Sequence, residues 1–364
     1  MNHRILSLLS VMALAGSAAA EVAYEAAPNF ITPPPGRETI GNGHGDIACD
    51  KAGNFYISVQ DKDAGVQVYS PEGKYLRTLP FPPSLHGFVL REDEGQEYLY
   101  CAVLGEQRLF KAKLDGTVVL DIPKSSFPAG KCLPTTFELK DNTKLAGHVT
   151  AETGDSVTFT QPDGTPKTLA KADIAARREG GLKLTNCDVA PNGDIYTVDG
   201  YGQNWIFVFD RSGKFKKVFG GPGGTIKLAN THKIFIDRRF SPERIFTCDR
   251  GNNRIIHLDL DGNMIGVVAD QNMRRPSAAA FHGDLVAVAE IAGRVSVWDK
   301  ENKLVAELGA NPNPKQTNTP KVEPKDWVNG TVTSPHGITF DNSGNILMTE
   351  WNIYGRVLRW TAKK

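Results

Sequence analysis

The stretch from Thr231 to Asn263, THKIFIDRRFSPERIFTCDRGNNRIIHLDLDGN, sets the pattern that the rest of the chain repeats. Its apolar runs are short, rich in Ile, Phe and Thr, and bounded by Asn, Asp and Gly, as strands and their turns are. With the run that follows, it predicts four strands: Lys233–Asp237, Arg244–Cys248, Arg254–Leu258 and Met264–Val268. One such sheet cannot bury both of its faces, so we expect sister sheets beside it.

Sister units are present along most of the chain. They begin at His44, His86, Thr185, His232, near Ser277 and at His336. A period of roughly 40 residues with four strands per unit is typical of a β-propeller. We therefore predict an all-β chain that forms a six-bladed β-propeller. The last unit lacks an obvious fourth strand, and we expect the segment Glu25–Ile40 to supply it.

One segment, residues 137–178, breaks the repeat between the second and third units. Ser156–Thr160 alternates at period two, a turn signal follows at Asp163-Gly164, and Lys171–Arg178 forms a short tail. We expect a small all-β insertion here, because propellers tolerate inserts at surface connections. The segment resembles a small all-β module of exported bacterial proteins, which assigns it no role.

The first twenty residues have the features of a secretory signal peptide. Arg4 precedes an apolar run, Ile5–Leu14, and the small residues Ala18 to Ala20 precede Glu21. We expect cleavage after Ala20 and a periplasmic or extracellular location. Residues 21–364 would form the propeller, interrupted by the insertion at 128–182. No later stretch is long and apolar enough to cross a bilayer.

Composition narrows the partners. Lys and Arg number 42 and Asp and Glu 41, which gives a net charge of +1. No basic patch interleaved with aromatic residues occurs, so we expect no nucleic acid partner, and we expect a monomer. Of the five cysteines, Cys49, Cys101 and Cys248 lie in predicted strands, which favours buried thiols. One disulfide through Cys132 or Cys187 stays an alternative.

Four of the eight histidines begin units. His86, His232 and His336 fall on the second, fourth and sixth units, and alternate blades of a six-bladed ring lie about 120° apart. Three imidazoles would then converge on the axis and leave a position open, as in a catalytic zinc site. Iron, cobalt or copper would also suit three imidazoles.

A structural interpretation competes with the metal site. A polar residue at this position can simply cap the start of a strand. His44, on the first unit, breaks the threefold pattern and is either a fourth polar contact or a turn residue. We expect the remaining histidines to lie outside the site: His3, His148, His257 and His282.

Two further residues belong to loops that face the same rim. Tyr201 follows the second strand of the third unit, and Arg250 follows the second strand of the fourth. A phenol beside a metal can act as a general base, and a guanidinium can hold a substrate carboxylate. The alternatives are a tyrosine that packs on its neighbour and an arginine that braces Asp249.

The pattern resembles the NHL-repeat six-bladed propellers, and among them most of all the peptidyl-hydroxyglycine (peptidylamidoglycolate) lyase domain. The stretches that carry the resemblance are Leu85-His86-Gly87, Val198-Asp199-Gly200-Tyr201, Thr231-His232, Cys248 to Ile255 and Ser334-Pro335-His336-Gly337. The resemblance implies that His86, His232 and His336 bind zinc, that Tyr201 acts as the base and that Arg250 grips the substrate carboxylate.

The chain also departs from that family. The first unit's loop, Val59 to Asp63, lacks the family's second arginine. Gly337 replaces an aspartate that helps to bind a structural calcium, so calcium is expected only as a weaker alternative. Ser334 replaces a methionine. The metal ligands and the base are retained, whereas the grip on the substrate is altered.

Together these features predict an exported, metal-dependent lyase that acts on a small molecule or peptide at the rim. It would cleave the C–N bond of an α-hydroxyglycine-type hemiaminal to an amide and glyoxylate. The first alternative is a non-catalytic NHL-type propeller that binds a peptide, glycan or protein. The second is a lactonase-like hydrolase, whose carboxylate and amide ligands would include residues such as Asn186 or Glu290.

Overall fold

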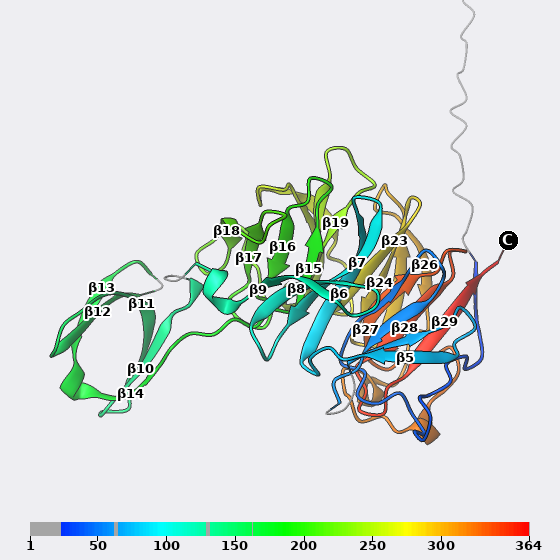
Figure 1. Ribbon diagram of the computed structural model, residues 1–364, viewed down its shortest axis with the longest axis horizontal. Helices are drawn as coiled ribbons and strands as arrows, with labels where there is room; N and C mark the ends of the chain where they lie inside the picture. Colours follow the sequence, from blue (N-terminus) through cyan, green and yellow to red (C-terminus); the bar gives the residue numbers. More distant parts are fainter. Residues whose placement is uncertain (1–22, 62–64, 129–131, 162, 364) are drawn as a thin grey trace, which may run out of the picture.

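The computed structural model describes residues 23–61, 65–128, 132–161 and 163–363. In this part the chain forms six four-stranded sheets and one five-stranded sheet (Figure 1), and its only helices are short 3-10 turns. The prediction of an all-β chain is confirmed. The expected signal peptide, residues 1–20, lies outside the described residues.

The six four-stranded sheets, called sheets 1 to 6 in chain order, are antiparallel meanders. Sheet 1 contains β2 (Ile47–Cys49), β3 (Phe55–Ser58), β4 (Val66–Tyr69) and β5 (Tyr75–Leu79). Sheet 2 contains β6 (Leu85–Asp93), β7 (Gln96–Val103), β8 (Arg108–Lys113) and β9 (Val118–Ile122). Sheet 3 contains β15 (Asn186–Val189), β16 (Ile195–Val198), β17 (Trp205–Phe209) and β18 (Phe215–Gly220). Sheet 4 contains β19 (Thr231–Asp237), β20 (Arg244–Asp249), β21 (Arg254–Leu258) and β22 (Met264–Ala269). Sheet 5 contains β23 (Pro276–His282), β24 (Leu285–Glu290), β25 (Arg294–Trp298) and β26 (Leu304–Leu308). Sheet 6 contains β27 (Pro335–Phe340), β28 (Ile346–Glu350), β29 (Val357–Ala362) and, from the start of the chain, β1 (Tyr24–Ala26).

Sheet 4 confirms the four predicted strands, with ends that differ by at most two residues. The largest difference is at β19, which begins two residues earlier than predicted. Its pairing with β20 continues beyond a bulge and ends at Thr231. The bulge places Thr231 opposite Asp249 and Lys233 opposite Cys248, so His232 is the extra residue.

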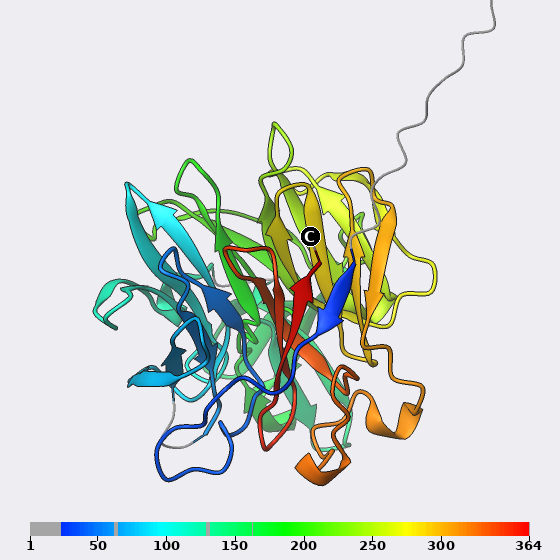
Figure 2. The ribbon, with the colours of Figure 1, turned by 90° about the vertical axis from the view of Figure 1, so that its right-hand side faces the viewer.

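The first strands of the six sheets form a closed ring. β2 contacts β6, β6 contacts β15, β15 contacts β19, β19 contacts β23, β23 contacts β27, and β27 contacts β2. The ring is completed at sheet 6, where Tyr24 pairs with Ala362 and Ala26 with Trp360. Figure 2 shows this N-terminal strand in blue beside the C-terminal strand in red. The N-terminal segment completes the last unit as predicted, but only Glu25 and Ala26 of the predicted segment Glu25–Ile40 lie in the strand.

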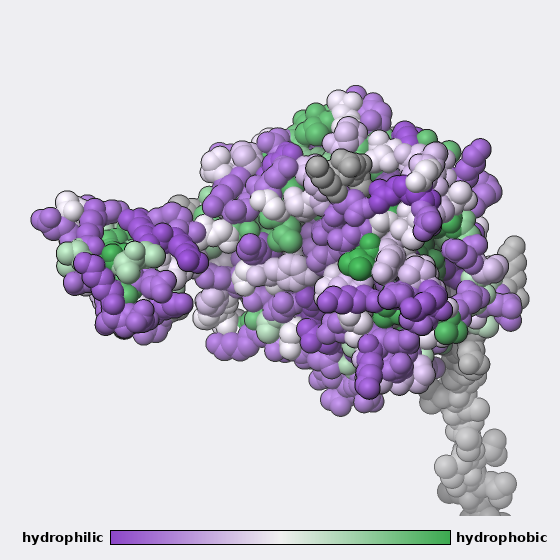
Figure 3. All heavy atoms as spheres, turned by 90° about the horizontal axis from the view of Figure 1, so that it is seen from below, coloured by the Kyte–Doolittle hydropathy of each residue, from purple (hydrophilic) through white to green (hydrophobic). Residues whose placement is uncertain are grey.

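The five-stranded sheet lies in sequence between sheets 2 and 3 and projects from the ring (Figure 1). Its strands are β10 (Thr135–Leu139), β11 (Lys144–Glu152), β12 (Ser156–Thr160), β13 (Pro166–Ala170) and β14 (Ile174–Arg178). It has its own small core of Phe137, Val157, Phe159 and Leu169. In Figure 3 the apolar side chains of this lobe are framed by hydrophilic ones. The expected tail is in fact a 3-10 turn followed by β14, which pairs with β10.

Burial within each ring sheet falls from the inner strands to the outer ones. β17 is buried along its whole length, whereas Val118 and Val119 of β9 are each 46% exposed. Cys49, Cys101, Cys187 and Cys248 are free thiols, so the alternative of a bridge through Cys187 is wrong. Within the described ranges, no helix has the length and apolar character needed to span a membrane.

Candidate metal centre

One position recurs at the start of the first strands, where the ring opens to the rim. In sheets 2, 4, 5 and 6 it is the residue that a β-bulge leaves without a partner on the second strand: His86, His232, Ser277 and His336. Bulges of this kind re-aim a side chain. Three of the four therefore point an imidazole out of the strand ladder, and all three are fully buried.

Each of these histidines is held by the sheet that follows it. The Nδ1 atom of His86 lies 2.8 Å from the carbonyl oxygen of Thr185, that of His232 lies 2.6 Å from Ser277, and that of His336 lies 2.9 Å from Gly45. A carbonyl oxygen can only accept, so Nδ1 carries the proton in each ring. The lone pair is therefore on Nε2, which is the arrangement found in metal-ligating histidines.

The three imidazoles are close neighbours. Their ring centres are 5.2 Å apart for His86 and His232, 5.0 Å for His86 and His336, and 4.8 Å for His232 and His336. Burial lowers the pKa of all three well below the usual histidine value, so the rings are neutral. Neutral imidazole is the form that binds metals.

Tyr201 places its hydroxyl among these nitrogens. Its oxygen lies 3.0 Å from Nε2 of His232 and 3.2 Å from Nε2 of His86. One phenolic proton can serve only one of these acceptors. Nε2 of His336 is buried and has no hydrogen-bond partner among the described residues. The cluster thus holds more lone pairs than donors, and a cation would satisfy this excess.

His44 is a fourth member of the cluster. Its Nδ1 lies 3.1 Å from Oε1 of Gln60, and its Nε2 lies 3.4 Å from the Tyr201 hydroxyl. The donor atoms of His44, His86 and His336 all lie within 4.8 Å of one another. This geometric trio contains His44 in place of the predicted His232. The two sets share His86 and His336, and the Tyr201 hydroxyl contacts both His44 and His232.

The sequence held a signal for His44 that the pattern of alternate units concealed. In sheet 1 the position after His44 is Gly45, where an added Cβ would lie 2.0 Å from the Ser58 hydroxyl. Only glycine therefore fits against Ser58 at the position directly after His44. Burial lowers the pKa of His44 to about 4, so it is also neutral.

Arg250 overlooks the cluster from sheet 4. It opens a 3-10 turn, Arg250–Asn252, directly after β20, and its Nε donates to Asn230 Oδ1 at 2.8 Å. Its guanidinium carbon lies 5.3 Å from the centre of the Tyr201 ring. The alternative role of bracing Asp249 belongs instead to Arg254, whose Nε donates to that carboxylate at 2.7 Å.

Tyr201 is positioned by the turn that follows β16. Asp199 accepts hydrogen bonds from the backbone N–H groups of Lys183 at 2.5 Å and Gln203 at 2.7 Å, which closes the loop around the tyrosine. Burial raises the pKa of Tyr201, and the positive charge of Arg250 opposes this shift. The phenol is therefore protonated in the metal-free protein.

A buried ion pair lies beneath the histidines. Nζ of Lys233 lies 2.7 Å from Oδ1 of Asp46 and 3.3 Å from the carbonyl oxygen of His336. Lys233 comes from sheet 4 and Asp46 precedes the first strand of sheet 1, so the pair joins opposite sides of the ring. Through the bond to the His336 carbonyl, this pair lies directly against the histidine cluster.

The other described histidines lie elsewhere. His257 bonds to Asp237 at 3.1 Å, His282 stacks on Phe340 with ring centres 5.4 Å apart, and His148 is in the five-stranded sheet. Sequence reasoning placed these three outside the site, and the structure agrees. His3 is outside the described residues.

Comparison with known proteins places the fold. No family model and no curated protein matches the chain. Among solved structures, a streptogramin B lyase superposes with a TM-score of 0.54 over 94% of this chain and 98% of its own, at 14% identity. A catalytically inactive variant of virginiamycin B lyase from Staphylococcus aureus, solved with quinupristin, gives a TM-score of 0.52 over 94% and 99%, at 13% identity. The chain therefore has a β-propeller fold.

Proposed function

We propose that this chain is a six-bladed NHL-type propeller that works as an exported, metal-dependent C–N lyase. The observation that carries the proposal is the set of converging Nε2 lone pairs on His86, His232 and His336, each fixed by an Nδ1–H bond to a carbonyl of the next sheet. A cluster that only capped strands would not need three buried, neutral imidazoles with a fourth, half-buried one beside them.

The donor set fits zinc or another divalent transition metal. Imidazole nitrogen suits zinc, copper, iron and nickel, whereas calcium prefers oxygen ligands. The ammonium group of Lys233 lies directly below the histidines and would repel a second divalent cation deeper in the channel. Calcium is the weaker proposal, because the site offers imidazole nitrogens where calcium prefers oxygen ligands.

The proposed reaction needs a metal held by the histidines, Tyr201 as the base and Arg250 to bind the substrate. A metal held by the histidines would act as a Lewis acid toward a bound hydroxyl and lower its pKa. Its charge would also lower the pKa of Tyr201, against the effect of burial. Tyr201 would then accept the hydroxyl proton of an α-hydroxyglycine-type hemiaminal.

The remaining steps conserve atoms and charge. As the O–H bond breaks, its electrons form the C=O of glyoxylate, the C–N bond breaks, and the amide nitrogen takes up one proton. Arg250 would bind the carboxylate of the substrate, because its guanidinium lies beside Tyr201 and only its Nε is bonded to Asn230. The products are a primary amide and glyoxylate.

A second candidate comes from the structural neighbours. The streptogramin B and virginiamycin B lyases share the fold at 13% to 14% identity, and one of them was solved with quinupristin. Quinupristin is therefore a second substrate to assay. A lactonase-like site is less favoured, because Glu290 is buried against Arg294, with Nη2 of Arg294 donating at 2.9 Å.

The decisive experiment is elemental analysis of the protein, wild type beside the His86→Ala/His232→Ala variant. We expect about one zinc per chain, lost in the variant. Glyoxylate release from an α-hydroxyglycine peptide should follow the metal. Wild type without a transition metal after zinc-supplemented expression would refute the proposal and favour a propeller that binds a peptide, glycan or protein.

The rest of the organisation belongs to the same proposal. Residues 1–20 would be removed on export to the periplasm or the medium, and 21–364 would work as a monomer. The module at 128–182 would be a separate insertion.

A further inference from the structure

A cavity lies at the end of the channel opposite the histidines. It has a volume of about 430 Å³ and is lined by the first strands of sheets 1, 2, 4, 5 and 6. In sheet 2, β6 runs from His86 at the rim to Arg91 at the cavity, about 16 Å at 3.3 Å per residue. This volume is in the range of small-molecule sites in proteins.

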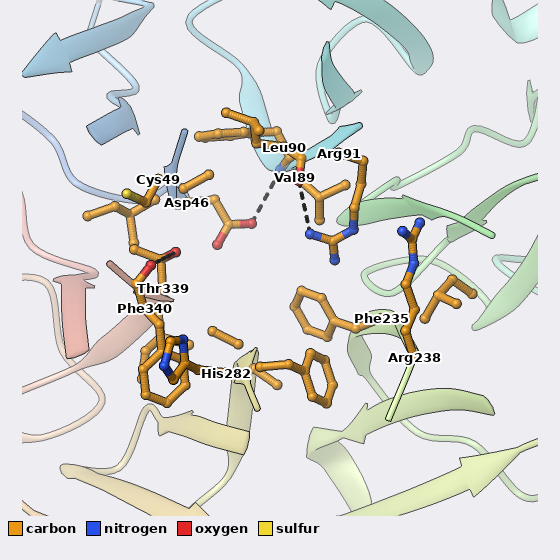
Figure 4. A pocket seen from close by; sticks show the side chains of 18 of the residues that line it. Asp46, Cys49, Val89, Leu90, Arg91, Phe235, Arg238, His282, Thr339 and Phe340 are labelled. Atoms are coloured by element: carbon orange, nitrogen blue, oxygen red, sulfur yellow. Dashed lines mark hydrogen bonds between the residues drawn. The ribbon is translucent and has the colours of Figure 1, made fainter. Parts of the chain in front are cut away.

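The cavity has aromatic walls. Phe235 of β19, Phe281 of β23 and Phe340 of β27 line it, and the His282 ring stacks on Phe340 at 5.4 Å with an interplanar angle of 30°. Figure 4 shows Phe235 across the cavity from Phe340 and His282. These rings come from three different sheets and offer flat apolar surface to a ligand body.

Most charges at the cavity are neutralised within the protein. Arg91 grips Asp188 with Nε at 2.9 Å and Nη2 at 2.8 Å, and its Nη1 donates to the Leu90 carbonyl at 3.0 Å. Asp46 is paired with Lys233.

The guanidinium of Arg239 has partners for Nε, Nη1 and Nη2. Its Nε and Nη2 hold Asp237 at 2.9 and 2.7 Å, and its Nη1 donates to the Asp284 carbonyl at 3.0 Å. The guanidinium groups of Arg91 and Arg239 therefore each use three of their five N–H donors within the protein, and a carboxylate paired with each already balances its charge.

Arg238 differs from these two arginines. Its Nη2 donates to the Val189 carbonyl at 2.8 Å, and within the described ranges no carboxylate lies at ion-pair distance from it. Figure 4 shows its guanidinium beside that of Arg91, on the opposite side of the cavity from Thr339 and Phe340. Burial, and then the charge of Arg91, lower the pKa of Arg238, whereas the charges of Asp188 and Glu243 oppose this shift. The residue is exposed and lines the cavity, so it offers a ligand a positive charge that no carboxylate in the described ranges pairs with directly.

We propose that this cavity binds a small carboxylate with an aromatic or branched apolar body. The carboxylate would take the free donors of Arg238, and the body would lie against Phe235, Phe281 and Phe340. A single negative charge fits better than a phosphate, because Arg91 and Arg239 are already paired with carboxylates and Arg238 is left to bind the ligand. The inference is independent of the metal and of the proposed lyase activity.

The test is calorimetric titration of the mature protein with phenylacetate, beside the uncharged phenylacetamide. We expect saturable binding of phenylacetate and a Kd at least about tenfold higher for phenylacetamide, since a hydrogen bond between charged groups is stronger than one with a neutral amide. Arg238→Gln should weaken phenylacetate binding by a similar factor. Ala280→Phe, which fills the cavity and leaves Arg238 in place, should abolish binding.

Matched controls separate this site from the histidine end. Arg108→Gln removes an arginine on β8 that is paired with Glu106 and Asp121, and it should leave the Kd unchanged. Arg250→Gln should also leave it unchanged. Absence of binding at millimolar phenylacetate, equal binding by Arg238→Gln, or loss of binding in Arg250→Gln would each overturn the proposal.

Discussion

The two ends of the channel are built from the same strands but present opposite chemistry. At the rim, bulged residues of sheets 2, 4 and 6 bring neutral imidazoles together, with lone pairs in excess of donors. At the other end, regular stretches of the same strands carry aromatic rings and guanidinium groups. We propose a cation as the ligand of the first end and an anion as the ligand of the second.

One repeated strand can therefore serve two sites. A bulge turns one residue out of the ladder and toward the axis, whereas regular pairing directs side chains between neighbouring sheets. The Lys233–Asp46 ion pair lies between the ends, because Lys233 bonds to the carbonyl of His336 and Asp46 lines the cavity. Each end can for this reason be altered without the other.

The largest effect is expected from breaking the ion pair. Lys233→Met would leave the Asp46 carboxylate buried without its partner, and loss of one partner of such a pair costs about 3–5 kcal/mol. Urea unfolding of the mature protein should show this loss in the free energy of unfolding.

The control for this prediction is a surface pair. Lys217→Met breaks the exposed contact with Asp261 and should change the free energy of unfolding by about 1 kcal/mol or less. The double variant Lys233→Met/Asp46→Asn should recover much of the lost stability. If Lys233→Met were as stable as wild type, the ion pair between sheets 1 and 4 would not contribute to the stability of the ring.

A large catalytic effect is expected from Tyr201→Phe. Removal of a general base typically lowers kcat by about 10²- to 10⁴-fold. The metal content should stay that of wild type, because the hydroxyl contacts the nitrogens and the metal would be held by the rings. Full turnover of an α-hydroxyglycine peptide by this variant would remove Tyr201 from the mechanism.

A smaller, selective effect is expected from Arg250→Lys. A lysine cannot bind a carboxylate in two parallel hydrogen bonds, so KM should rise about tenfold with a smaller change in kcat. Arg238→Gln should leave KM unchanged, because it belongs to the other end of the channel. A KM that responds equally to both variants would mean that the two ends are not separate.

The smallest effect is expected from His44→Gln. His44 comes from outside the recurring bulge, so the remaining three imidazoles should still retain zinc, with an affinity lower by about tenfold. Competition with a chelator measures this change. Complete loss of zinc in His44→Gln, with retention in His232→Ala, would make His44, His86 and His336 the ligand set.

The strands and their order are specified locally, by the amino-acid sequence alone. Short apolar runs with Gly and Asn turns favour β-hairpins, which is why β21 was predicted to the residue and β12 within the five-stranded sheet likewise. The sequence also directed attention to His86, His232 and His336, because they recur at one place in the repeat. These signals depend on neighbours along the chain.

What those residues meet depends on how the sheets pack. The Nδ1 bonds to Thr185, Ser277 and Gly45 join different sheets, so no local pattern fixes the tautomer. The approach of His44, the Lys233–Asp46 pair across the ring and the unpaired Arg238 likewise depend on closure of the sheets. These contacts join residues that are far apart in sequence. They form only when all six sheets have packed around the common axis, so they depend on the tertiary structure.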